Sequence, residues 1–190
     1  QQLAVWLATN IGKLFTGNSL RKTFNIGSSS SIMEYLSYFT DAYLFFYIPK
    51  FSYSHKVQLV NPKKIYCVDN GLVTVNSVSF SDDKGRLFEN MVFMCLRRRT
   101  DEIYYYADKG ECDFVVYHNG KLLGLYQACF VLNDINFQRE INGLKEAMNF
   151  FNVKSATIIT QNQHDSFKLN NKTIRVLPFY EWTKLSIDSI

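Results

Sequence analysis

The chain has 190 residues, of which 47% are apolar, 20% charged and 16% aromatic, and this composition excludes a disordered protein. The longest unbroken apolar run, residues 42–48, is far shorter than the roughly 20 residues of a membrane-spanning helix, so we expect no membrane contact. All of the net charge of +4 lies in residues 1–70, and it is modest for a dedicated DNA-binding protein.

The start of the chain and its cysteines suggest where the protein resides. The opening segment QQLAVWL has neither an initiator Met nor the pattern of a signal peptide, so we interpret the sequence as a piece of a longer protein. The cysteines, which are Cys67, Cys95, Cys112 and Cys129, form no CxxC pair, and three lie in apolar segments. We therefore predict buried free thiols of a cytoplasmic protein rather than disulfides or a zinc site.

Residues 1–78 have the element order of a winged-helix domain. Apolar residues at helical spacing predict the first helix, and a serine run at 28–31 predicts the N-cap of a later one. The predicted elements are a helix at 3–15, a short helix at 19–24, a helix from Ile32 onward, and strands at 41–48 and 64–68 joined by a long loop.

Residues 79–190 begin at the turn-rich segment SFSDDKG, which is the predicted domain boundary. The first helix of this part has Leu87, Met91 and Leu96 on its predicted inner face, and Asn119-Gly120 predicts a tight hairpin. The predicted elements are a helix at 86–99, strands at 102–108, 112–118 and 121–131, a helix at 137–151, and strands at 155–160 and 173–179. This αβββαββ order predicts a restriction-endonuclease-like domain, so the fold class is α/β (α+β).

Three polar residues of the second domain suggest chemistry. Glu89 lies on the first helix, Asp113 on the second strand and Gln127 in the middle of the third. Acids gathered at that point of a mixed sheet can bind Mg²⁺ and activate water against a phosphodiester. The alternative is structural, with Asp113 bonded to neighbouring backbone groups. No P-loop, G-x-S-x-G or HExxH motif occurs, so these residues cannot bind ATP through a P-loop.

Several segments resemble one known family. They are GRLFENMVFMCLRRR at 85–99, EIYYYADKGECDFVV at 102–116, LYQACF at 125–130, and the K-x-Y-x-x-D-x-G-L signature in KKIYCVDNGL at 63–72. Their order and spacing are similar to those of the C-terminal region of predicted AAA-family ATPases of bacteria and archaea, where a winged helix precedes a domain of unknown function. The resemblance implies an ATPase module, with its ATP, ahead of Gln1, and a nuclease-like fold related to the PD-(D/E)XK superfamily.

The resemblance also implies site residues and a defect among them. Glu89 corresponds to the first-helix acid of that superfamily and Asp113 to its strand acid, so these two would be the ligands of any Mg²⁺. The remaining signature, an acid and a lysine one residue apart, reads Gln127-Ala128-Cys129 here. Cys129 lacks the charge and the reach of that lysine, although Lys121 or Lys145 could replace it. We therefore expect a nuclease-like domain without cleavage activity.

The winged helix leaves a choice between DNA and a protein partner. Nucleic acid would contact basic residues of the first domain, which are Arg21, Lys22, Lys56, Lys63 and Lys64. The helix that would enter the major groove begins with serines and has no cation, and the aromatic run 43–47 is more apolar than one small domain needs. Both features favour contact with the ATPase module or with another protein.

Taken together, these patterns predict an accessory and regulatory region of an AAA-family ATPase that acts by binding. The alternatives are a metal-dependent DNA endonuclease and a winged-helix DNA-binding protein. At the end of the strand in the K-x-Y-x-x-D-x-G-L segment, Asp69 is predicted to accept backbone N–H bonds of the turn that joins the domains.

Overall fold

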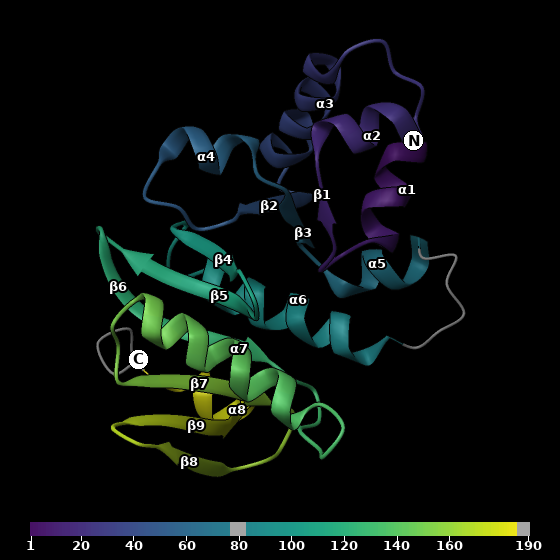
Figure 1. The fold of residues 1–190 in the computed structure, drawn as a ribbon. Coiled ribbons are helices and arrows are strands. Elements are labelled where there is room, and N and C mark those ends of the chain that lie inside the picture. The colour runs from purple at the N-terminus through teal and green to yellow at the C-terminus, as the bar shows by residue number, and fades with distance from the viewer. Residues whose placement is uncertain (77–82, 186–190) are drawn as a thin grey trace. The chain divides into compact units, whose positions relative to one another are not determined.

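The computed structural model describes residues 1–76 and 83–185, which form a mixed α+β fold with two sheets (Figure 1). The chain divides into two compact units, residues 1–91 and 92–190, and the division lies inside helix α6 (Lys84–Arg97). The predicted domain boundary at residue 79 lies outside the described residues. None of the described helices is long and apolar enough to cross a membrane.

The first unit consists of short helices around a small sheet. Its sheet has the order β1-β3-β2, with both pairs antiparallel. The elements are α1 (Gln2–Thr9), β1 (Leu14–Phe15), α2 (Gly17–Thr23), α3 (Ser29–Asp41), β2 (Phe45–Pro49), α4 (His55–Val60), β3 (Lys63–Cys67), α5 (Asn70–Asn76) and the first half of α6. A core of buried side chains joins α1, α2, α3 and β3, with Leu7, Leu20, Ile32 and Ile65 at its centre.

The predicted helix over residues 3–15 is only partly correct. Helix α1 ends at Thr9, because the Asn10 side chain binds the carbonyl oxygen of Trp6 and Gly12 adopts a φ of +71°, which no helix contains. The N–H of Gly12 then donates to Ile65 O, at 2.8 Å. Leu14 and Phe15, which fit the helical spacing, form strand β1 instead.

The serine cap was correctly predicted, whereas the start of the following strand was not. Ser28 caps α3, since its side chain accepts the N–H of Ser31 at 3.1 Å. Helix α3 continues to Asp41, and Tyr43 reverses the chain at a φ of +55°, so strand β2 starts only at Phe45. Helices α4 and α5 were not predicted from the sequence, and β1 was absorbed into the first predicted helix.

The second unit is a six-stranded sheet covered on both faces. The strand order is β4-β5-β6-β7-β9-β8, in which β6, β7 and β9 run parallel and the other pairs are antiparallel. The elements are β4 (Ile103–Ala107), β5 (Glu111–His118), β6 (Lys121–Ala128), α7 (Phe137–Phe150), β7 (Ser155–Thr160), β8 (Asp165–Leu169), β9 (Lys172–Pro178) and α8 (Phe179–Trp182). The predicted Asn-Gly hairpin is confirmed, with Asn119 and Gly120 at φ of +51° and +71°.

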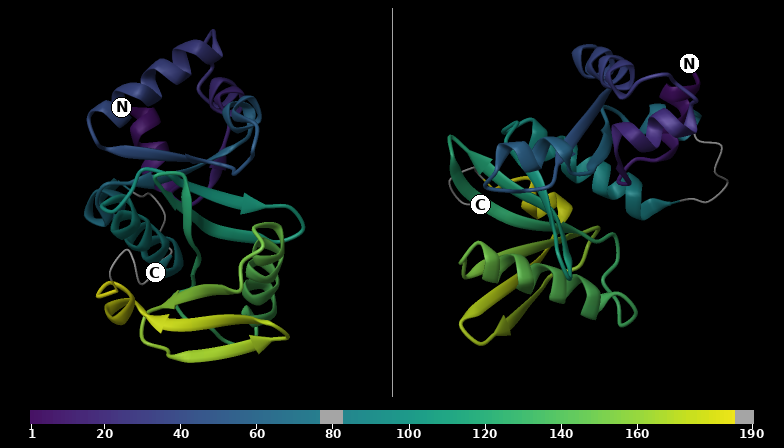
Figure 2. Two further views of the ribbon diagram at one scale, coloured as in Figure 1. Left: turned by 90° about the vertical axis from the view of Figure 1, so that its left-hand side faces the viewer. Right: turned by 45° about the horizontal axis from the view of Figure 1, so that its top comes forward.

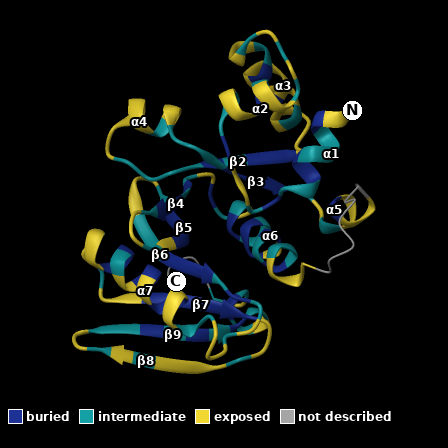
Figure 3. Ribbon diagram, turned by 45° about the vertical axis from the view of Figure 1, so that its right-hand side comes forward, coloured by how far each residue is buried: buried dark blue, intermediate teal, exposed yellow. Residues whose placement is uncertain are grey.

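Different helices cover the two faces of this sheet (Figure 2). Helix α7 lies across β5, β6 and β7, and α8 packs on β7 and β9. The ring of Phe93 in α6 lies 6.3 Å from that of Phe114 in β5. Strand β8, which was not predicted, is the largely exposed edge of the sheet, whereas β5 and β7 are mostly buried (Figure 3).

The four cysteines are free thiols, as predicted, and Cys67, Cys112 and Cys129 are buried, whereas Cys95 is only partly buried.

Candidate functional site

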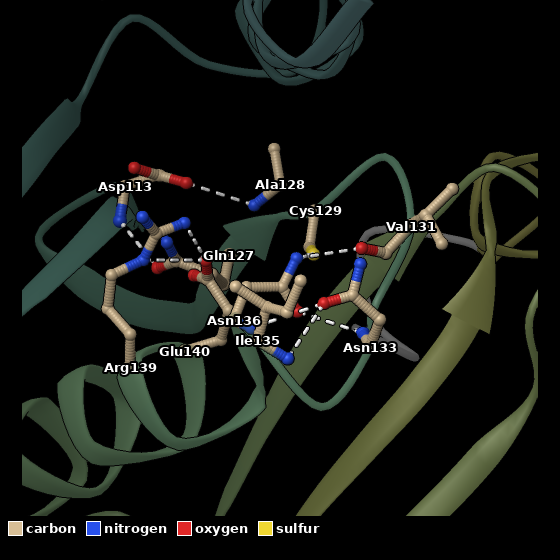
Figure 4. A network of polar contacts seen from close by, with 10 residues as sticks. All are labelled: Asp113, Gln127, Ala128, Cys129, Val131, Asn133, Ile135, Asn136, Arg139 and Glu140. Carbon is tan, nitrogen blue, oxygen red and sulfur yellow. Dashed lines mark hydrogen bonds and ion pairs between the residues drawn. The ribbon is translucent and has the colours of Figure 1, made fainter.

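Asp113 and Gln127 face each other across strands β5 and β6, on the face that α7 covers (Figure 4). Both side chains are buried. The N–H of Asp113 donates to Gln127 Oε1 at 3.1 Å, and the N–H of Ala128 donates to Asp113 Oδ2 at 3.0 Å. The two predicted site residues are therefore brought together, and both make bonds that continue the pairing of the two strands.

Glu140 of α7 is the site residue that sequence reasoning missed. It is 4% exposed, and Arg139 donates to its Oε1 through Nε at 3.1 Å and also through Nη2. Burial raises the pKa of Glu140, the bonds from Arg139 oppose that shift without cancelling it, and the charge of Asp113 adds to it. The sequence does carry a signal for this burial, because Glu140 precedes Ile141 and Leu144 on the buried stripe of the helix.

Cys129 is the residue that the resemblance places where a lysine is expected. Burial raises the pKa of its thiol to about 12, so the side chain is neutral at physiological pH. Asn136 Nδ2 contacts the sulfur at 3.6 Å. Neither Lys121, at the exposed start of β6, nor Lys145, on the exposed face of α7, is buried in this cluster. The cation that the structure brings beside Glu140 is the guanidinium of Arg139.

Close contacts fix α7 over the start of β5. A Cβ at Gly143 would lie 2.1 Å from Glu111 O, so the helix and strand backbones touch at a position that only glycine allows. Glu146 accepts the N–H groups of Lys109 at 3.1 Å and Gly110 at 2.6 Å, and the hydroxyl of Tyr106 at 3.1 Å. Burial opposes ionisation of Glu146, but these hydrogen bonds outweigh it and lower its pKa.

Glu89, the third predicted site residue, belongs to the first unit and makes its described contacts there. Its Oε1 pairs with Lys64 Nζ at 3.2 Å and accepts the hydroxyl of Tyr66 at 2.7 Å. Lys64 is 3% exposed, so its ammonium is buried against this carboxylate. A Cβ at Gly12 would lie 3.2 Å from Glu89 Oε2, so the chain approaches the carboxylate closely on a second side.

The K-x-Y-x-x-D-x-G-L signature spans Lys64 to Leu72, and these contacts give it a structural role. Its Lys64 and Tyr66 bind Glu89, while Asp69 Oδ1 accepts the N–H groups of Gly71 at 2.6 Å and Leu72 at 3.3 Å at the start of α5. Asp69 thus accepts backbone N–H bonds of a turn, as predicted, but this turn joins β3 to α5 inside the first unit and does not join the two units.

Asn90, next to Glu89, completes the attachment of α6 to β3. It exchanges two hydrogen bonds with the backbone of Cys67, at 2.8 and 2.9 Å, and its Nδ2 also donates to Asn70 Oδ1. The side-chain amide of Asn90 therefore binds both backbone groups of Cys67, in the way that a residue of a neighbouring strand would.

Oxygen atoms of the kind that Mg²⁺ prefers are present in the second unit, but they fit a metal poorly. Asp113 Oδ2 accepts a backbone N–H, Gln127 Oε1 accepts another, and Glu140 Oε1 is held by Arg139. Among residues 1–76 and 83–185, no group of three or more His, Cys, Asp or Glu side chains could hold a metal ion. We derive no metal-dependent step from this site.

The predicted nucleic-acid-binding cations differ in their exposure. Lys22 and Lys56 are exposed and Arg21 is half-buried, on α2 and α4. Lys63 is half-buried, and burial lowers its pKa. Lys64 is the buried partner of Glu89 described above.

Two comparisons with known proteins give matches. Residues 1–82 match the family described as a domain of unknown function, DUF8612. The chain is 36% identical over 177 residues to the uncharacterized protein MJ1544 of Methanocaldococcus jannaschii, and the match covers 87% of this chain. The chain spans 39% of the length of that relative. No solved structure matches the chain at a significant level.

Proposed function

We propose that the chain is an accessory and regulatory region of a longer AAA-family ATPase, in which a winged-helix unit and a nuclease-like unit act by binding rather than by chemistry. One observation carries the proposal: the polar groups at the nuclease-like positions are engaged in bonds that hold the fold. Asp113 and Gln127 pair β5 with β6, and Cys129 is a buried neutral thiol where a lysine would stabilise the developing charge.

The topology of the second unit supports the nuclease-like half of the proposal. From α6 to β7 its elements follow the order αβββαβ, and α7 connects the parallel strands β6 and β7. Asp113 and Gln127 occupy neighbouring central strands, as the acids of the PD-(D/E)XK superfamily do in the resemblance. The scaffold is therefore compatible with that superfamily, whereas the side chains on it are not those of an active member.

The first unit supports the winged-helix half. The order is α1-β1-α2-α3-β2-α4-β3, and apart from the added helix α4 between β2 and β3 it is, with its antiparallel sheet β1-β3-β2, the arrangement expected of a winged helix. Helix α3 takes the place of the recognition helix, and it exposes Met33, Tyr35 and Tyr38 but has no cation. Since contacts to the DNA backbone depend on cations, this surface favours a protein partner over DNA.

An apolar groove in the first unit offers a place for that partner. It has a volume of about 540 Å³ and is lined by residues of α1, α3 and the segment between α2 and α3: Gln1, Gln2, Leu3, Phe24, Ile26, Tyr35, Tyr38 and Phe39. The ATPase module that the resemblance implies would join the chain at Gln1, beside this groove. We therefore propose that the module packs its own apolar side chains there.

Relaxation of supercoiled plasmid in Mg²⁺ or Mn²⁺ tests the absence of chemistry. We expect no cleavage above background by the wild-type chain, and the same background from Asp113→Ala. A Gln127→Glu/Cys129→Lys variant, which restores the signature, tests whether the scaffold can still support the reaction. Metal-dependent nicking by the wild type that Asp113→Ala abolishes would establish the endonuclease alternative.

Duplex DNA binding measured over a salt series tests the choice of partner. We expect weak binding whose small salt slope decreases in Arg21→Ala/Lys22→Ala and does not change in the control Arg98→Ala. Tight binding with a steep salt slope that the double variant removes would favour DNA over a protein partner.

A further inference from the structure

Four buried hydrogen-bond donors of the second unit have no partner among the described residues. They are Arg99 Nη1, Tyr126 OH, Arg175 Nε and Trp182 Nε1. Buried polar atoms of this kind are costly unless something accepts their hydrogen bonds. Three are donors only, and the tyrosine hydroxyl can also donate, so the missing partner must be an acceptor.

The four side chains form one connected group on the face of the sheet opposite α7. Tyr126 of β6 and Arg175 of β9 each pair in register with Thr157 of β7, so they lie in one row across the sheet. The Trp182 ring lies 5.9 Å from the Tyr126 ring, and the guanidinium carbon of Arg99 lies 5.3 Å from the Trp182 ring centre.

The group carries the positive charges of Arg99 and Arg175. No described acidic side chain forms an ion pair with Arg99 or Arg175, and the described partner of Arg99 is the carbonyl oxygen of Thr183, at 3.1 Å from Nη2. Burial raises the pKa of the Tyr126 hydroxyl, and the charges of Arg99 and Arg175 oppose that shift without cancelling it. The hydroxyl therefore stays protonated and can donate a hydrogen bond to an anion.

A small cavity borders two members of this group, Tyr126 and Arg175. It has a volume of about 70 Å³ and is lined by Tyr126, Thr157, Arg175 and neighbouring residues of β6 and β7. Gly124 is part of the lining, and a Cβ there would lie 2.5 Å from the Tyr126 hydroxyl oxygen. A cavity needs about 10–15 Å³ to hold one water. A cavity of about 70 Å³ is several times larger, so it has room for a small oxyanion.

We propose that Arg99, Tyr126, Arg175 and Trp182 form a binding site for a phosphate group. Two guanidinium groups, a hydroxyl and an indole N–H can together satisfy the oxygen atoms of a tetrahedral oxyanion, and such charge-assisted bonds are strong in a buried site. This site lies on the opposite face of the sheet from Asp113 and Gln127, and it does not depend on whether that cluster is catalytic.

Titration of the full chain with inorganic phosphate, at constant ionic strength maintained with chloride, tests this site by calorimetry and thermal unfolding. We expect saturable binding and a rise in the melting temperature that chloride does not produce. Arg175→Gln should weaken binding about tenfold, because it removes a charged donor. Tyr126→Phe, which keeps the ring beside Trp182, should weaken it several-fold. The exposed control Arg98→Gln should bind like the wild type.

Titrations with two further compounds identify the source of the phosphate group. Binding of adenosine 5′-monophosphate but not of adenosine would support the site and show that it accepts a phosphate carried by a larger molecule. Phosphate binding alone would support a free oxyanion. If Arg175→Gln fails to fold, the phosphate affinity of Tyr126→Phe tests the site.

Two results would overturn the proposal. One is equal melting temperatures in phosphate and chloride, and the other is unchanged phosphate affinity in Tyr126→Phe. Asp188, outside the described residues, is a carboxylate of the same chain. In one such outcome, phosphate has no effect on the melting temperature while Asp188→Asn lowers it as much as Arg175→Gln does. This result would mean that the acceptor is a carboxylate of the chain itself, and the proposal would be wrong.

Discussion

Glu140 and Glu146 lie on the same helix, yet their surroundings shift their pKa values in opposite directions. Glu140 is buried against Gln127 and Asp113, and burial raises its pKa above the ordinary 4.5. The carboxylate of Glu146 accepts two backbone N–H groups and a hydroxyl, and its pKa is lowered. A raised native pKa means that the folded state binds protons more tightly than the unfolded state, so the two residues should affect stability with opposite dependence on pH.

The stability of Glu140→Gln relative to the wild type should increase as the pH rises. Because the native pKa of Glu140 is raised, wild-type stability decreases as the pH rises from about 4.5 through that native pKa, and a neutral glutamine does not have this dependence. We expect the melting temperature of Glu140→Gln minus that of the wild type to increase between pH 4 and pH 7. A decrease over that range would mean that the bonds from Arg139 dominate and that Glu140 is a stabilising ion-pair partner.

Glu146→Gln should show the reverse trend. At pH 7 the substitution should cost about 1–3 kcal/mol, since an amide cannot accept the N–H groups of both Lys109 and Gly110. The contribution of Glu146 is present above the ordinary pKa and is lost as the pH falls through the lowered native pKa. The difference in unfolding free energy between wild type and variant should therefore shrink toward pH 3, and a constant difference would contradict this interpretation.

Glu89 should behave as half of a buried ion pair. Glu89→Gln leaves the ammonium of Lys64 buried without its carboxylate, and we expect a loss of about 3 kcal/mol in the free energy of unfolding. Lys64→Met/Glu89→Gln removes both charges and should regain most of that loss, which denaturant unfolding of the four forms of the mutant cycle would measure. Additive effects in the cycle would show that the pair does not stabilise the first unit.

Among the elements, α7 is placed by a single glycine as much as by its apolar face. Gly143→Ala puts a Cβ into the backbone of β5, and we expect a net cost of about 2–3 kcal/mol even though alanine favours a helix. Gly27→Ala is the matched control, since no atom lies within 4 Å of the added Cβ, and its effect should stay within about 0.5–1 kcal/mol. Urea unfolding compares the two, and similar small losses would mean that α7 can shift without cost.

Regular amphipathic elements could be predicted from the sequence, and elements set by backbone geometry could not. Helices α3 and α7 and strands β5 and β7 follow from periodicity and caps. Strand β1 was hidden inside a helical pattern because the positive φ of Gly12 cannot be distinguished in the sequence from an ordinary helical glycine. In α6 the predicted face is displaced, since Phe88, Val92 and Phe93 are buried while Met91 is 36% exposed.

The candidate site could be predicted only in part. Asp113 and Gln127 lie on adjacent strands, as the Asn-Gly hairpin predicts, but they are brought opposite each other by a shift of register between Val116 and Tyr117 that the sequence does not reveal. Glu140 was missed because acids in the first turn of a helix are usually exposed, although its place one turn before Leu144 puts it on the buried stripe. The partners of Glu89 were missed because Lys64 and Tyr66 reach it through a tertiary contact.

At the scale of the whole molecule, each unit has its own polar network, and each network includes an acid that the sequence predicted as a site residue. Lys64, Tyr66 and Glu89 hold β3 to α6 in the first unit, while Asp113 and Gln127 hold β5 to β6 in the second. Acids that stabilise a fold and acids that perform catalysis differ in the sign of their effect on stability. Removal of a structural acid destabilises the protein, whereas removal of an active-site acid often stabilises it.

Thermal unfolding of the wild type, Asp113→Ala and Glu89→Gln, each in EDTA and in Mn²⁺, makes that comparison. If these acids hold the fold, both variants melt several degrees below the wild type in EDTA, and Mn²⁺ changes none of the three. Variants that melt at or above the wild type, together with a Mn²⁺-dependent rise that only the wild type shows, would contradict a structural role and identify a functional metal site.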